Sequence, residues 1–335
     1  MDRNEEDMKN IGFFGIFKQS FKTIFKYTKL FTQITLTFIL PLSIIFLAHT
    51  TISNRFFSRI ENSYLDNYDY NRRNVTVSDW LYFWLFKVIY FTFLTVFSLL
   101  ATAAVVFTIA SVYADRDVVF RHVFKVVPRI WKRLVVTFVV IYLAMFLYNV
   151  IYGVIVFLTR AVFGYSTLGA VIFLILFVVY VYGFLYLSVV WQLASVVSVL
   201  ENNQGIKAMR KGKELLYGKK KSGMGIAFVL YGILVGILLV YELYVQFGDH
   251  LVGLAMIWRV IIGISCCLVL MMVFLLFMVT QTVLYLVCKS YHREAIDKLS
   301  LSTFLGAYTE ETVVYPKPEE IQLGRAQPQQ VAQEV

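Results

Sequence analysis

Cysteine is scarce in this sequence, and recognisable catalytic motifs are missing. The chain of 335 residues has three cysteines, Cys266, Cys267 and Cys288, and all fall in or beside the last apolar run, so they fit neither a disulfide framework nor a zinc-ligand spacing. Its four histidines are scattered, and it contains no HExxH pattern, glycine-rich phosphate loop or nucleophile elbow. The sequence therefore predicts a protein that is not an enzyme and has no catalytic residue, metal site or cofactor.

Charge is also sparse, and what there is lies unevenly along the chain. Charged residues make up 16% of the sequence and apolar residues 59%, whereas soluble domains average about 45–50% apolar residues. The mean hydropathy is +0.71, which is typical of an integral membrane protein. The net charge of +10 comes from lysines and arginines in short segments between apolar runs. In those positions membrane lipids are nearer partners than nucleic acid, so we expect anionic lipids and no nucleic acid.

Six apolar stretches are long enough to cross the hydrocarbon core, which takes about 20 residues. They cover residues 30–50, 81–113, 134–158, 168–200, 223–246 and 256–288. An even number of spans places both termini on one side, and the lysines and arginines beside the N-terminus, before the third and fifth spans and after the last make that side cytoplasmic. The predicted fold class is therefore all-α, a polytopic membrane protein in the plasma membrane or an endomembrane such as the endoplasmic reticulum.

The regions outside the spans have distinct compositions. Residues 1–29 are expected to be a cytoplasmic N-terminus with a basic amphipathic helix, residues 30–307 the six-span membrane domain, and residues 308–335 a disordered cytoplasmic tail. The first apolar run starts late and is long, which favours a retained signal anchor over a cleaved signal. Asn74 begins the sequon Asn-Val-Thr in a loop on the non-cytoplasmic side, so it is a candidate for glycosylation. Cys288, at a membrane edge, is either a site for S-palmitoylation or a small buried side chain.

Two basic ladders precede the first and third spans with the same spacing of i, i+4, i+8 and i+11. This spacing gathers the charges on one side of a helix, next to a face rich in phenylalanine. Such helices lie on membrane surfaces and attract anionic lipid, with Pro128 expected to kink or break the second one. The predicted lipid-binding residues are Lys18, Lys22, Lys26 and Lys29 in the first ladder, and Arg121, Lys125, Arg129 and Lys132 in the second.

An internal repeat connects these ladders to the spans. Residues 105–112 closely match residues 189–196, and each set ends an even-numbered span. The chain therefore divides into three units, each an interfacial amphipathic segment followed by a membrane hairpin. In the third unit Gly205, Gly212 and Gly218 are expected to weaken the amphipathic helix.

Polar residues inside the spans offer a second kind of site. Lys87, Glu242 and Arg259 lie near the predicted outer ends of the spans. Either Glu242 pairs with one of the two cations along a solute pathway, or the three side chains extend to the outer interface. Three further residues lie near the inner ends of the even-numbered spans, where they either form a hydrogen-bonded centre or act as helix-packing contacts. These are Thr108, Gln192 and Gln281.

Gly232 and Gly236 form a GxxxG pair in the fifth span. Such a pair permits close helix contact, here either within one chain or between two copies. The sequence leaves open whether the protein is a homo-oligomer or has other membrane-protein partners.

Several short blocks resemble a family of plant multi-pass membrane proteins of unknown function. That family is more distantly similar to the membrane domain that precedes the catalytic domain in some bacterial glycerophosphodiester phosphodiesterases. The phosphodiesterase catalytic domain has no counterpart here, so the resemblance implies the membrane fold and not the activity. The blocks are Gly15-Ile16-Phe17-Lys18, Phe38-Ile39-Leu40-Pro41-Leu42-Ser43, Ala194-Ser195-Val196-Val197, Glu201, Ala208-Met209-Arg210-Lys211-Gly212-Lys213 and Lys289-Ser290-Tyr291-His292.

Together these features favour a non-enzymatic membrane protein that organises lipid or acts as a scaffold through basic interfacial helices. A transporter or channel for a small solute is the alternative. Such a protein needs a polar path, and the polar residues in the spans named above are the only ones that could line it.

Overall fold

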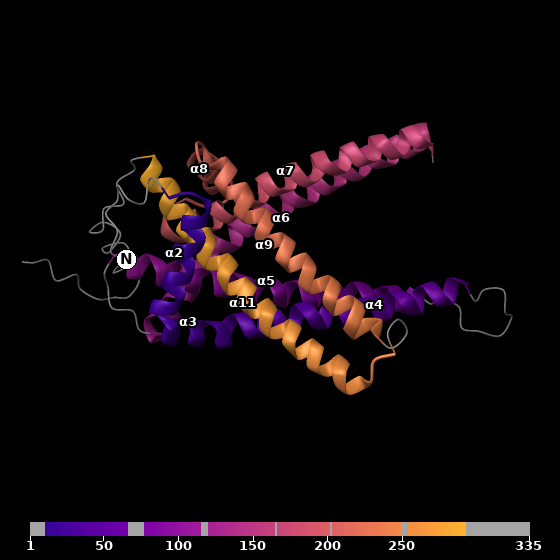
Figure 1. The fold of residues 1–335 in the computed structure, drawn as a ribbon, viewed down its shortest axis with the longest axis horizontal. Helices are drawn as coiled ribbons and strands as arrows, with labels where there is room; N and C mark the ends of the chain where they lie inside the picture. Colours follow the sequence, from indigo (N-terminus) through magenta and orange to yellow (C-terminus); the bar gives the residue numbers. More distant parts are fainter. Residues whose placement is uncertain are drawn as a thin grey trace, which may run out of the picture.

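Helices make up almost all of the part of the chain that the computed structural model describes, which is residues 11–65, 77–114, 120–164, 166–201, 203–248 and 253–292, and no strand occurs within these ranges (Figure 1). The elements are α2 (Phe13–Lys26), α3 (Thr28–Ile34), the π-helical turn η1 (Thr35–Ile39), α4 (Leu40–Leu65), α5 (Val77–Tyr113), α6 (Phe120–Phe163), α7 (Thr167–Leu200), α8 (Ile206–Leu216), α9 (Lys220–Tyr241), the π-helical turn η3 (Glu242–Gln246) and α11 (Met256–Tyr291).

Six helical stretches are long and apolar enough to cross a membrane, so the chain is an integral membrane protein. The stretches agree with the predicted spans to within a few residues at most ends, and the all-α, six-helix fold class is confirmed. They are Thr28–Asn54, Trp80–Tyr113, Ile130–Phe163, Thr167–Leu200, Lys220–Gln246 and Met256–Tyr291.

The second basic ladder and the third span form a single helix. Helix α6 runs for 44 residues and contains Pro128, so of the two effects predicted for this proline, a kink or a break, the break does not occur. Pro128 is exposed. Because proline has no N–H, the carbonyl oxygen of Phe124 lacks its usual partner within the helix. This oxygen lies on the exposed side of the helix, where polar surroundings can donate to it.

The core lies at one end of the molecule, where the last turns of α5, α7 and α11 pack against one another. Most residues are buried from Leu99 to Tyr113 in α5, from Ser188 to Leu200 in α7 and from Met278 to Cys288 in α11. Many of these side chains are small, which lets the helix backbones approach closely. We call this the basic end, because α2, α8 and Lys219–Lys221 lie here.

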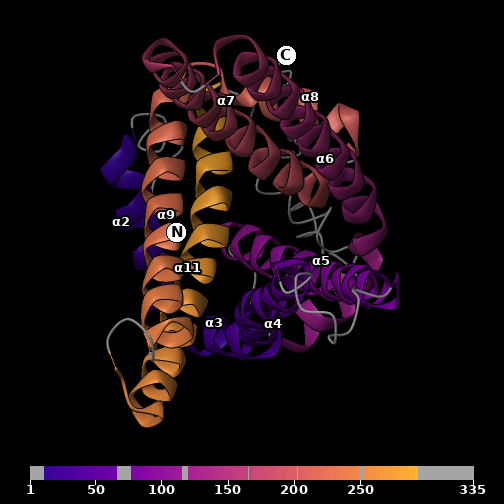
Figure 2. The same ribbon diagram turned by 90° about the vertical axis from the view of Figure 1, so that its right-hand side faces the viewer.

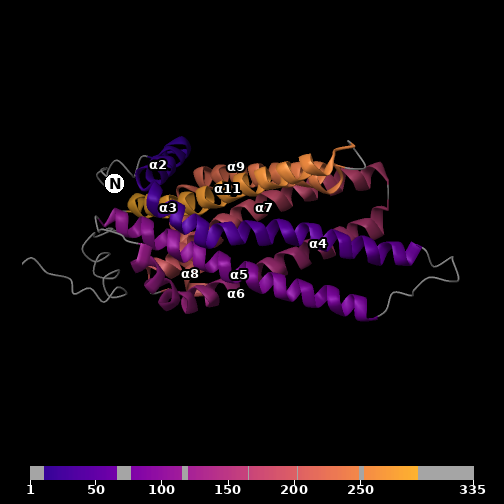
Figure 3. The ribbon, with the colours of Figure 1, turned by 90° about the horizontal axis from the view of Figure 1, so that it is seen from below.

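Toward the opposite end, which we call the hairpin end, the α6–α7 hairpin separates from the other two hairpins (Figures 1, 2 and 3). Helix α4 stays in contact with α9 and η3 there, through hydrogen bonds of Thr51 with Tyr241 and of Asn54 with Gln246. The α6–α7 hairpin diverges most visibly from the rest. Among its described residues between Val139 and Gly183, none belongs to a hydrophobic cluster of the protein. Much of this hairpin therefore faces the membrane rather than other helices.

Three glycines allow α8 to turn and to pack closely on the core. Gly205 and Gly218 flank the helix with φ angles of +60° and +88°, a region that favours glycine. At Gly212 an added Cβ would lie 2.9 Å from the carbonyl oxygen of Val190 and 3.1 Å from the amide nitrogen of Ala194. The glycines predicted to weaken the third amphipathic helix are thus also the residues that let it turn and pack closely on α7.

We predict that Gly212→Ala destabilises the protein by about 1–3 kcal/mol, because the new methyl group must displace the α7 backbone. The matched control is Gly232→Ala in α9, where an added Cβ meets nothing within 4 Å and the higher helix propensity of alanine favours folding by up to about 1 kcal/mol. Thermal unfolding of both purified variants in detergent checks the prediction. Equal melting temperatures for the two variants would contradict it.

Candidate functional site

Helix α2 presents three different faces at the basic end. Ile16, Ser20 and Thr23 are buried. On the free surface the phenylalanines form one strip, with Phe14 82% and Phe25 74% exposed. A second strip is basic, because Lys18, Lys22 and Lys26 of α2, and Lys29 at the start of α3, are all exposed. This pairing of exposed aromatic and basic strips is the pattern of a helix that lies in a membrane interface.

The buried face fixes α2 to the bundle. Helix α2 packs on α11 and also contacts α9. Just before the helix, the carbonyl oxygen of Ile11 accepts a hydrogen bond of 3.2 Å from Lys219 Nζ. Inside it, Ser20 donates to the carbonyl oxygen of Ile16, so this buried hydroxyl is satisfied locally. Three of the four lysines are therefore carried by an anchored helix, and Lys29 follows at the start of α3.

The second ladder shows a related arrangement at the start of α6. Lys132 is exposed, and so are Phe124 and Trp131, which are 53% and 40% exposed. A buried strip of Val123, Val126, Val127 and Ile130 packs this part of α6 into the core. The side chains of the other three ladder residues, Arg121, Lys125 and Arg129, lie outside the described residues.

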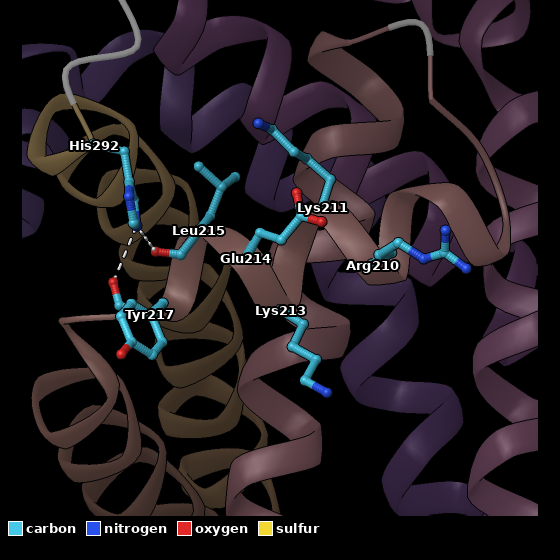
Figure 4. A pocket seen from close by; sticks show the side chains of 7 residues that line it. All are labelled: Arg210, Lys211, Lys213, Glu214, Leu215, Tyr217 and His292. Carbon is cyan, nitrogen blue, oxygen red and sulfur yellow. Dashed lines mark hydrogen bonds between the residues drawn. The ribbon is translucent and has the colours of Figure 1, made fainter.

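Helix α8 borders an open hollow of about 520 Å³ beside the end of α11 (Figure 4). One wall is fixed by His292, whose Nε2–H donates to the carbonyl oxygens of Leu215 at 3.1 Å and Tyr217 at 3.0 Å. Three cations and one carboxylate line the hollow, which gives it a net positive charge suited to an anionic head group. Its lining residues are Arg210, Lys211, Lys213, Glu214, Leu215, Tyr217 and His292.

A carboxylate network joins α7 to α11 beside this hollow. Glu201, which caps the C-terminus of α7, accepts hydrogen bonds from the Tyr285 hydroxyl at 2.7 Å and from Lys289 Nζ at 2.9 Å. Burial by itself raises the pKa of the Glu201 carboxyl, but the hydrogen bonds from Tyr285 and Lys289, with the charges of Lys289 and Lys211, outweigh burial and lower that pKa below its ordinary value. Glu201 is therefore ionised and fixes the ends of the two helices.

Sequence reasoning did not identify this network as a site. Glu201 and Lys289 are 88 residues apart, so their contact depends on the tertiary fold. One signal in the sequence could have indicated it: Glu201 directly follows an apolar span and precedes a basic segment. A carboxylate in that position needs a cation nearby.

The chain matches the model of one protein family along almost its whole length. The match covers residues 1–326, and the family is described as a domain of unknown function, DUF8558. The chain belongs to this family. No curated protein and no solved structure matches it.

The charged residues of the predicted solute pathway engage other partners. Lys87 Nζ lies 2.9 Å from His49 Nε2 and donates to Ser53 Oγ at 2.8 Å, so it links α5 to α4. Arg259 donates from Nε and Nη2 to the carbonyl oxygen of Val245, at 3.0 and 2.8 Å. Among the described residues no ion pair joins Glu242 to either cation.

The inner polar residues lie on the three helices that form the core. Thr108 and Gln281 are buried and Gln192 is half-buried. The Thr108 hydroxyl and the Gln192 side-chain amide nitrogen have no hydrogen-bond partner in the described part of the chain. The hydrogen-bonded centre considered for these three residues is therefore not formed in this structure.

Gly232 and Gly236 do not face another helix at close range. An added Cβ at either position meets nothing within 4 Å, so close contact through this pair within one chain is not seen. Gly236 instead lines an open apolar groove of about 400 Å³ between α9 and α11. Contact between two copies stays a prediction.

Asn74, the candidate for glycosylation, lies outside the described residues. Cys288 is buried, which fits its interpretation as a small buried side chain.

We predict that Glu201→Gln lowers stability at pH 7 by about 2 kcal/mol, because the hydrogen bonds and the ion pair with Lys289 lose the negative charge. Since folding lowers the pKa of Glu201, its contribution is present above the unfolded-state pKa of about 4.3 and is lost as pH falls through the folded-state value. The difference between wild type and variant should therefore shrink as the pH falls below about 4.

Unfolding of the purified protein in detergent, followed over that pH range, tests this. Glu214→Gln is the matched control, because Glu214 is an exposed carboxylate on the neighbouring helix α8. A difference between wild type and Glu201→Gln that stays constant with pH would contradict the assignment.

Proposed function

We propose that this protein is a non-enzymatic membrane scaffold that gathers anionic lipid at its basic end. The observation that supports this most strongly is α2, where exposed lysines and exposed phenylalanines lie side by side while the third face is held on α11 and α9. The phenylalanines match the boundary between acyl chains and head groups, and the lysines match the anionic head groups above it.

The size of the attraction is sufficient for this role. A lysine near an anionic membrane surface contributes about 1 kcal/mol, and the first ladder supplies four. Because the spans already hold α2 at the membrane, this energy is available for selecting lipids rather than for binding the membrane at all. The cations around the α8 hollow extend the same basic surface to the other side of α11.

Orientation and location follow from the same charges. Lysine and arginine are enriched on cytoplasmic sides, so we propose that the basic end and both termini face the cytoplasm. The narrower resemblance to plant multi-pass proteins, and through them to a bacterial phosphodiesterase membrane domain, stays a prediction and carries no activity with it.

Solute transport is the alternative that the sequence left open, and no observation favours it specifically. A path would need polar groups facing a common channel. Lys87 instead binds His49 and Ser53 of α4, and Arg259 binds backbone carbonyl oxygens near the end of η3.

Replacing Lys18, Lys22, Lys26 and Lys29 together by glutamine should lower the selectivity for anionic lipid several-fold, because each lysine contributes about 1 kcal/mol to the attraction of the anionic lipid beside it. Protein reconstituted in phosphatidylcholine vesicles, with spin-labelled phosphatidylserine or phosphatidylcholine, gives this selectivity as the ratio of the two association constants. Raising the salt concentration should reduce the wild-type ratio as well, since exposed charges are screened.

The matched control changes the same four lysines to arginine, which keeps every charge and should keep the ratio. A second set changes Phe14, Phe21 and Phe25 to alanine and tests the aromatic strip separately. The proposal fails if the glutamine variant is folded and selects phosphatidylserine as well as wild type does, even after the second ladder is neutralised too.

A further inference from the structure

A polar side chain lies exposed near the middle of a membrane-spanning helix. Asn149 of α6 stands between Arg133 and Arg160, the charged residues nearest to it on either side along this helix. At a rise of 1.5 Å per residue it is about 4 Å from the midpoint between them, so it lies within the hydrocarbon core. It belongs to the part of the α6–α7 hairpin that contributes to no hydrophobic cluster, and it is exposed.

The Asn149 amide is held in place but only partly satisfied. Its Nδ2 donates to the carbonyl oxygen of Met145 at 2.8 Å, and its Oδ1 accepts from the Tyr180 hydroxyl at 2.9 Å. Tyr180 is itself fixed, because its ring stacks on Tyr152 and its carbonyl oxygen accepts from the Tyr148 hydroxyl. A primary amide offers two donors and two acceptor positions, so one donor and one acceptor remain.

The surrounding surface has the shape of a contact site for a helix. Gly153 lies one turn after Asn149, is exposed, and has nothing within 4 Å of an added Cβ. Phe146 and Phe157 lie on the same side of α6 and are 66% and 71% exposed. The small residues at 149 and 153 therefore form a shallow notch between two large aromatic side chains.

We propose that this notch is a dimer interface, in which α6 of one copy crosses α6 of a second copy at Asn149 and Gly153. Lipid tails cannot satisfy the remaining donor and acceptor of the amide, whereas another polar group in the membrane can. A second copy is the occupant that fits, because the free donor and free acceptor of Asn149 are mutually complementary across a two-fold axis. Gly153 lets the two backbones approach closely enough for the amides to meet.

A two-fold axis along the membrane normal places both basic ends on the same side of the membrane. The dimer would therefore present two copies of α2 and α8 to one leaflet. This assembly goes beyond the lipid-organising role proposed above and does not depend on it.

The test is dimerisation of the full chain in phosphatidylcholine vesicles, measured by energy transfer between donor-labelled and acceptor-labelled copies as the lipid-to-protein ratio is varied. Without anionic lipid in the vesicles, the result is independent of the proposed function. Wild type should associate, and Asn149→Leu should weaken the association constant about tenfold through loss of the two amide hydrogen bonds. Asn149→Gln keeps an amide and should restore part of the association.

Gly153→Leu tests the notch while the Asn149–Tyr180 hydrogen bond inside the hairpin is preserved. Its new side chain enters open space, so folding should be unaffected while the dimer weakens by at least the same factor. The matched control is Val154→Leu, at an exposed neighbouring position turned by about 100° around the helix. Wild type that stays monomeric at every lipid-to-protein ratio, or Gly153→Leu that associates like Val154→Leu, would overturn the proposal.

Discussion

Close packing of α5, α7 and α11 at the basic end is the interaction on which the other parts of the molecule depend. These helices bury small and β-branched residues, so their backbones lie close together and van der Waals contact replaces contact with lipid. Helix α8 packs on the α7 part of this core through Gly212, and α2 packs on the α11 part through Ile16 and its neighbours. Glu201 then joins the ends of α7 and α11 through Tyr285 and Lys289.

The same constraint divides the molecule into two differently packed halves. At the basic end the packing is dense, and the cations that remain exposed are carried on anchored helices. At the hairpin end the α6–α7 hairpin separates from the other helices, and much of its surface faces the membrane (Figure 2). This combination of an anchored basic surface and a hairpin that faces the membrane supports the proposed lipid-organising role.

Two cations inside the spans, Lys87 and Arg259, are each paired locally. Lys87 binds His49 and Ser53, and Arg259 binds carbonyl oxygens next to the π-helical turn η3. Each cation thus finds oxygen or nitrogen partners within two neighbouring elements, which lowers the cost of holding it near hydrocarbon. Asn149 differs because its partners use only half of its hydrogen-bonding capacity, and this difference is what singles out α6 as a contact surface.

The sequence by itself determined the membrane class, the six spans and the face of α2 that carries lysine, because hydrocarbon thickness and helical periodicity act on local stretches of chain. The spacing of the first ladder predicted that its lysines share one side of a helix, but it did not show that another face of α2 is buried. Only the structure decided that the second ladder continues through Pro128 into the third span as one helix, that Gly212 lets α8 pack closely on α7, and that Glu201 contacts Lys289. These features depend on contacts between helices far apart in the chain, and local patterns of hydropathy and charge do not specify which helix packs against which.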